Sequence, residues 1–153
     1  MKILHHIPVI LLALAFLTFQ TEIYAQPQKD TKKKTEIRKL TKEEFEKTVY
    51  DPAKDGDKAV YKGKTPCIID FYADWCRPCK VLSPILEELQ EEYKGKIIIY
   101  KVNTDEQREL AQLYGISAIP TLFFFPKNEK PVVMRGAPSK EELKKVIEEY
   151  LKP

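Results

Sequence analysis

Two cysteines three residues apart, Cys76 and Cys79, are the residues of this 153-residue chain best suited to chemistry. They follow an apolar run at 67–73 and stand where a helix is predicted to begin, spanning about Arg77 to Tyr93. The unpaired N–H groups and the positive dipole end of a helix N-terminus favour a thiolate. A disulfide can bridge a separation of one helical turn. This pattern predicts a dithiol that cycles between thiol and disulfide.

The two thiols have different expected roles. Cys76 lies at or beside the N-cap and next to Arg77, and both features stabilise the thiolate that attacks a disulfide. Pro78 suits the first helical turn because it has no N–H to lose. Cys79 lies deeper, and we expect it to resolve the mixed disulfide. The apolar stripe expected to bury this helix comprises Val81, Leu82, Ile85, Leu86 and Leu89.

Asp70 is the next candidate for chemistry, because it stands inside the apolar run Cys-Ile-Ile-Asp-Phe-Tyr. Such a run is typical of a strand buried on both faces, where desolvation raises the pKa of a carboxyl group. An acid that titrates near neutrality can accept the proton of Cys79 during the second attack. The alternative is a structural aspartate paired with a lysine, and Lys101, in the apolar run 97–102, is a suitable partner. Both can hold, with Lys101 tuning Asp70.

Helix and strand signals alternate along the rest of the chain. Strands are expected at 36–40, 67–73, 96–103, 121–125 and 131–135, and helices at 41–50, 77–93, 106–114 and from 140 onward. Thr41 with Glu44 and Ser139 with Glu142 form capping boxes for two of these helices. The pattern predicts an α/β sandwich with helices on both faces of the sheet. The charged stretch 51–64 is expected to be a surface loop, with partner contacts as the alternative.

Several stretches, in this order, resemble the thioredoxin family over about 36–151. They are DFYADWCRPCK, SPILEEL, KVN, YGISAIPTL and the RGA that precedes the last helix. The resemblance implies a thioredoxin fold, an α/β fold with a central mixed sheet of about five strands flanked by about four helices. Arg77 is the chief departure, since the family pattern usually has glycine at this position.

The resemblance also implies how the site is built. It places Lys101 beside Asp70 and implies a cis peptide bond between Ile119 and Pro120, facing the cysteines. This geometry leaves the Ile119 backbone free to pair with an extended substrate segment. The residues expected to form the apolar platform and turn that bind protein substrates are Trp75, Arg77, Pro78, Ala118, Ile119, Pro120, Gly136 and Ala137.

Composition excludes several other functions. Both histidines, His5 and His6, lie in the first 25 residues, so the rest of the chain offers no Cys-His catalysis and no mixed Cys/His zinc site. No bound cofactor or metal is expected, because the cysteine pair is itself the redox unit. The net charge is +3, but residues 26–39 alone carry +4. The rest of the chain is therefore nearly neutral and lacks the basic surface that binds nucleic acid.

Cys67 is the third cysteine and begins the strand that leads to the active-site pair. Six residues of extended chain place it about 20 Å from Ala73, too far to join the pair. We expect it to be a buried small hydrophobe. A regulatory or intermolecular thiol is the alternative.

Residues 1–25 have the layout of a secretory signal peptide, with Lys2, an apolar run at 7–19 and cleavage expected after Ala25. The alternative is an uncleaved membrane anchor, although the run is shorter than the roughly 20 residues that span a bilayer. Residues 26–35 are then a basic flexible linker and residues 36–153 the thioredoxin domain. A periplasmic or secreted location follows.

The sequence therefore predicts an exported thiol-disulfide oxidoreductase, a monomeric protein-disulfide reductase that acts on protein disulfides. An inner-membrane electron donor is the expected partner, because a soluble cytoplasmic reductase cannot reach an exported protein. A disulfide oxidase or isomerase on the same fold is one alternative, since Arg77 stabilises the thiolate whereas Pro78 is typical of reducing members. A binding module that uses the platform without redox activity is the other.

Overall fold

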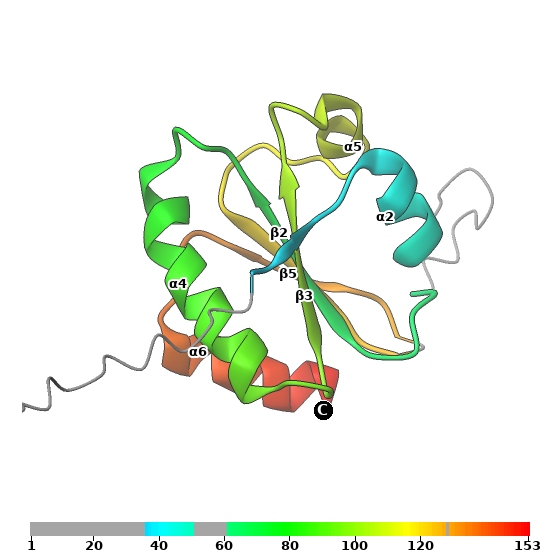
Figure 1. Cartoon of the computed structure of the whole chain (residues 1–153), viewed down its shortest axis with the longest axis vertical. Coiled ribbons are helices and arrows are strands. Elements are labelled where there is room, and N and C mark those ends of the chain that lie inside the picture. Colours follow the sequence, from blue (N-terminus) through cyan, green and yellow to red (C-terminus); the bar gives the residue numbers. More distant parts are fainter. Residues whose placement is uncertain (1–35, 51–60, 128) are drawn as a thin grey trace, which may run out of the picture. The chain divides into compact units, whose positions relative to one another are not determined.

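The computed structural model describes residues 36–50, 61–127 and 129–153. This part of the chain forms a five-stranded sheet in the order β1-β3-β2-β4-β5 (Figure 1). The strands are β1 (Arg38–Lys39), β2 (Cys67–Tyr72), β3 (Ile98–Asn103), β4 (Thr121–Phe125) and β5 (Val132–Arg135). The helices are α2 (Lys42–Thr48), α4 (Arg77–Glu92), α5 (Arg108–Leu113) and α6 (Lys140–Val146), which continues into a π-helical turn, η1 (Ile147–Leu151).

The sheet is mixed, as predicted. β1, β3 and β2 run parallel, whereas β4 is antiparallel to β2 and β5 is antiparallel to β4. The register places Asp70 of β2 opposite Lys101 of β3 on one side and Leu122 of β4 on the other. Neighbouring strands therefore bring the acid and the lysine to the same face of the sheet.

Helices cover both faces of the sheet (Figure 1), which explains why β2 is apolar along its whole length. Successive residues of a strand point to opposite faces, so Ile68 packs into one core cluster and Ile69 into the other. The first cluster includes Leu82, Leu86 and Leu89 of α4 with Leu143 of α6 and Ile147 of η1. The second includes Phe45 of α2, Leu110 of α5, and Phe71, Phe123 and Phe125 of the sheet.

Element types match the sequence predictions, and the observed bounds are shorter by a few residues at several ends. Both capping boxes are present, at Thr41 and at Ser139. Gly115 follows α5 with a φ of 62°, the left-handed conformation that favours glycine at a helix C-terminus. None of the described helices is both long and apolar enough to cross a membrane. The predicted signal peptide, the linker and most of the predicted loop lie outside the described residues.

The prediction that Val81 belongs to the buried stripe of α4 is wrong, because this side chain is 65% exposed. Leu82, Leu86 and Leu89 are fully buried and define the face that contacts the sheet. At about 100° per residue, Val81 lies roughly a quarter turn from the centre of that face, with half-buried Ile85 between.

Candidate active site

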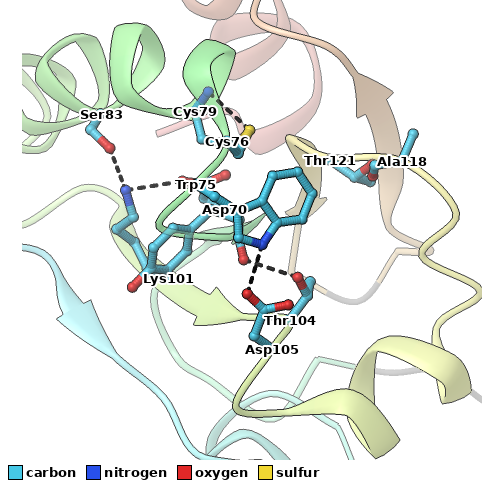
Figure 2. Close-up of a disulfide and its surroundings, with 11 residues drawn as sticks. Asp70, Trp75, Cys76, Cys79, Ser83, Lys101, Thr104, Asp105, Ala118 and Thr121 are labelled. Carbon is cyan, nitrogen blue, oxygen red and sulfur yellow. Dashed lines mark hydrogen bonds and ion pairs between the residues drawn. A yellow bond between two sulfur atoms is a disulfide. The ribbon is translucent and has the colours of Figure 1, made fainter.

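The two active-site cysteines lie at the start of α4 and form a disulfide with a Cα–Cα distance of 5.3 Å (Figure 2). Cys76 is the N-cap residue, and its sulfur accepts a hydrogen bond of 3.2 Å from the backbone N–H of Cys79. This bond satisfies one of the N–H groups that a helix N-terminus leaves unpaired. Both cysteines are buried, whereas Arg77 and Pro78 between them are exposed. The helix thus holds one sulfur over its N-terminal N–H groups and the other one turn further in.

Trp75 leads into this turn and exposes its ring, which is 69% accessible. Its indole N–H donates a 2.8 Å hydrogen bond to Asp105 Oδ2, in the loop after β3 (Figure 2). The Asp105 backbone N–H donates in turn to Asn103 Oδ1 at 2.9 Å. The loop therefore fixes the orientation of a large apolar ring at the rim of the site. The sequence gives no local signal for Asp105, which is 30 residues from Trp75.

The segment before β4 approaches the cysteines from another direction. The peptide bond between Ile119 and Pro120 is cis, as the family resemblance implies. Gly136 donates a 2.9 Å hydrogen bond to the Pro120 carbonyl, and its φ of 89° is one that favours glycine. Ala118 is exposed, and its carbonyl accepts a bond of 2.7 Å from the Thr121 hydroxyl. Ile119 packs against a small buried cluster of Tyr72, Ala73, Cys76 and Cys79.

Asp70 is completely buried on β2, and Lys101 Nζ lies 3.3 Å from its Oδ2 atom (Figure 2). Burial is the larger effect on this carboxyl group and raises its pKa to about 6, while the Lys101 ammonium acts in the opposite direction. The acid is thus able to gain and lose a proton near neutral pH. The lysine that the resemblance placed beside Asp70 is in that position.

The Lys101 ammonium has two further partners that the sequence analysis did not assign to the site. It donates a 2.5 Å hydrogen bond to Ser83 Oγ of α4, and it lies 4.4 Å from the centroid of the Tyr72 ring. A signal for Ser83 exists in the sequence, since it follows Cys79 by four residues and so lies on the same face of the helix. Tyr72 gave no comparable signal.

Cys67 is a free cysteine and is fully buried, as expected. Burial raises the pKa of its thiol to about 12. It packs in the core cluster on the α2 side of the sheet with Tyr61, Tyr100 and Phe125. Within the described ranges, no group of three or more His, Cys, Asp or Glu side chains is arranged to hold a metal ion.

Comparison with known proteins settles the family. A family model described as Thioredoxin matches residues 36–149. The chain belongs to the thioredoxin family. It is 39% identical to thioredoxin of Borreliella burgdorferi over 111 residues, which cover 72% of this chain and 94% of that protein. It is 45% identical to the chloroplastic M-type thioredoxin of Spinacia oleracea over 61% of this chain and 52% of that protein.

The fold agrees with this assignment. The solved structure of chloroplastic thioredoxin z matches 73% of this chain and 91% of its own, with a TM-score of 0.61 and 25% sequence identity. Thioredoxins are thiol-disulfide oxidoreductases with a redox-active cysteine pair, and here that pair is Cys76 and Cys79. The chain is therefore a thioredoxin-type redox protein.

Proposed function

We propose that this thioredoxin is an exported protein-disulfide reductase. The observation that carries the proposal is the arrangement of three buried groups: Cys76 at the N-cap of α4, Cys79 one turn further along the helix, and Asp70 on β2, the strand that leads to this turn. A helix N-terminus stabilises a thiolate at the first sulfur, while the second is held within bonding distance of it.

The reaction proceeds in two exchanges. The Cys76 thiolate attacks one sulfur of a substrate disulfide, forms a mixed disulfide and expels the other substrate sulfur as a thiolate. Cys79 then loses its proton and attacks the Cys76 sulfur, which breaks the mixed disulfide and releases the second substrate thiolate. Two electrons have passed to the substrate, and the protein is left with the Cys76–Cys79 disulfide that the structure contains.

Asp70 is the proposed acceptor of the Cys79 proton, and Lys101 tunes its acidity. A carboxyl group with a pKa of about 6 is ionised at neutral pH and can accept a proton within the protein. We expect Asp70→Asn to slow the second exchange more than the first. Stopped-flow measurement of mixed-disulfide formation and decay tests this, and equal slowing of the two steps would contradict the assignment.

The substrate is proposed to lie along the rim formed by Trp75, Ala118 and Ile119. The other residues proposed to bind it are Arg77 and Pro78, in the turn between the two cysteines, and Pro120 and Gly136, at the cis peptide bond. Trp75 offers exposed apolar area in a fixed orientation. The backbone next to the cis bond is available to pair with an extended segment of substrate. Such a surface favours unfolded or extended protein segments that carry a disulfide.

The direction of the reaction is tested by the reduction potential of the cysteine pair. The protein carrying Cys67→Ser is equilibrated in thiol-disulfide buffers, and the fluorescence of Trp75, the sole tryptophan, reports its redox state. A value near about −270 mV supports the reductase, whereas a value near about −120 mV makes the protein a disulfide donor. In the second case the positive charge of Arg77, exposed beside Cys76, outweighs the effect of Pro78.

Export is proposed from the leader sequence, which implies an electron donor at the inner membrane. Expression of the full chain in a Gram-negative host, followed by determination of the N-terminus of the periplasmic protein, is expected to give Gln26. Ala25→Arg removes the small residue at the cleavage site and is expected to block processing. A periplasmic fraction free of the protein would contradict the proposal.

A further inference from the structure

Ser83 makes a polar contact between α4 and the sheet that the thiol chemistry above does not use. Its Oγ atom lies 2.5 Å from Lys101 Nζ and accepts a hydrogen bond from it (Figure 2). The bond joins the helix that carries both cysteines to the strand β3 that carries the lysine. Ser83 is half-buried and the lysine side chain is only 11% exposed, so the contact lies largely inside the protein.

The Lys101 ammonium is held from three directions. A lysine ammonium has three N–H donors, and here its partners are Ser83 Oγ on α4, Asp70 Oδ2 at 3.3 Å on β2, and the face of the Tyr72 ring at 4.4 Å. The lysine stem has four rotatable carbons, so the position of the charge depends on these partners and not on the stem. Of these three partners, Ser83 is the one that lies on α4, the helix that begins at the active-site cysteines.

We propose that Ser83 is a positioning residue of the redox centre, which holds the Lys101 ammonium beside the Asp70 carboxylate by accepting a hydrogen bond from it. The inference rests on the proposed function in one respect, namely that Asp70 takes the proton of Cys79. Ser83 itself touches neither the substrate nor the sulfur atoms in this role, and it acts through Lys101.

The groups around Asp70 determine the consequence of losing this contact. On β3, Lys101 is its ion-pair partner, and on β4 the residue in register is the apolar Leu122. On β1, the charged residue is Lys39, whose Nζ lies 5.8 Å from the Tyr72 ring centroid. On α4, the titratable residues three or four positions from Ser83, and so on its face of the helix, are Cys79, Lys80 and Glu87. Burial raises the pKa of Asp70, and the Lys101 ammonium lowers it. If the ammonium moves away from the carboxylate, the pKa of Asp70 therefore rises.

The first test measures the titration of Asp70 directly. The side-chain carboxyl ¹³C signal of Asp70 is followed by NMR in the oxidised full chain, where the cysteines are in a disulfide and do not titrate. Ser83→Ala is expected to shift the midpoint upward by about 0.5–1 pH unit, the scale of losing one hydrogen bond to a charged neighbour. Alanine is the better helix former, so the variant is expected to fold. Ser83→Thr keeps the hydroxyl and is expected to titrate as the parent protein does.

The second test follows the reaction. The pH profile for decay of the mixed disulfide is expected to shift upward in Ser83→Ala with the Asp70 midpoint. In an Asp70→Asn background, Ser83→Ala is expected to change nothing further, because the two residues act through one lysine. A serine that only packs in the helix would move neither the midpoint nor the profile.

The outcomes separate the inference from the proposed function. An unchanged Asp70 midpoint in Ser83→Ala, or a threonine variant that titrates like alanine, overturns the positioning role even if the protein reduces disulfides. A shifted midpoint in a protein that reduces no protein disulfide supports the positioning role and overturns the proposed function. A shift in both the midpoint and the pH profile supports both.

Discussion

The buried carboxyl group of Asp70 is expected to make the free energy of unfolding depend on pH. Its pKa is about 6 in the folded protein and about 3.9 in an unfolded chain, so between these values the folded state binds more protons. Stability is therefore greatest at low pH with respect to this group and falls as pH rises through 4 to 6. Asp70→Asn removes this pH dependence of stability.

We expect the free energy of unfolding of Asp70→Asn, relative to the parent protein, to rise by about 2 kcal/mol between pH 4 and pH 7.5. Urea unfolding of the oxidised proteins at several pH values measures this. Asp74→Asn is the matched control, because it makes the same charge change at an exposed aspartate where no burial cost is removed. A constant difference across the pH range would show that the acid is not desolvated.

Cys67 is expected to be chemically silent in the folded protein. Its side chain is fully buried, and with a pKa of about 12 only about one thiol in ten thousand is ionised at pH 8. Peptide mapping after brief iodoacetamide treatment of the reduced, native protein should find the label on Cys76 and none on Cys67. In denaturant Cys67 should react readily. Labelling of native Cys67 at the rate of a free thiol would contradict its burial and reopen a regulatory role.

At the level of elements, the sequence predicted most of the fold because its signals are local. Capping boxes and apolar runs predict helices and strands from a few consecutive residues, whatever packs against them. Both capping boxes are present in the structure. Val81 was predicted wrongly because it lies at the edge of the helical stripe, where small rotations decide burial. Ser83 and Asp105 act on residues 18 and 30 positions away, and such contacts exist only once the helix is docked and the sheet register is set.

The Ser139 capping box is expected to stabilise α6 without influencing the redox site. Its hydroxyl accepts from the Glu142 backbone N–H at 3.3 Å, and the Glu142 carboxylate accepts from the Ser139 backbone N–H at 2.8 Å. Ser139→Ala should lower the free energy of unfolding by about 1 kcal/mol, whereas Ser139→Asp retains a capping oxygen and should lose little. Urea unfolding compares them. An unchanged free energy of unfolding in Ser139→Ala would show that the cap contributes nothing.

At the level of the whole molecule, residues 1–35 precede the domain that the structure describes from residue 36 onward. Its two large clusters are formed, within the described ranges, by residues from Ile37 onward. The match to the Borreliella burgdorferi thioredoxin uses 72% of this chain yet covers 94% of that protein. That thioredoxin therefore consists almost entirely of the segment that it shares with this chain. The first 35 residues are therefore expected to add no stability to the fold.

We expect a chain of residues 36–153 to unfold cooperatively with a free energy within about 0.5 kcal/mol of the longer chain that begins at Gln26. The physical reason is that no residue of the two described clusters is removed. Urea unfolding and the Cys76–Cys79 potential, measured on both chains, test the expectation, with Ile37→Ala in the shorter chain as the control that does remove a buried side chain. That control should lose about 2–4 kcal/mol. A shorter chain that unfolds without a cooperative transition would place part of the core in the leader or linker.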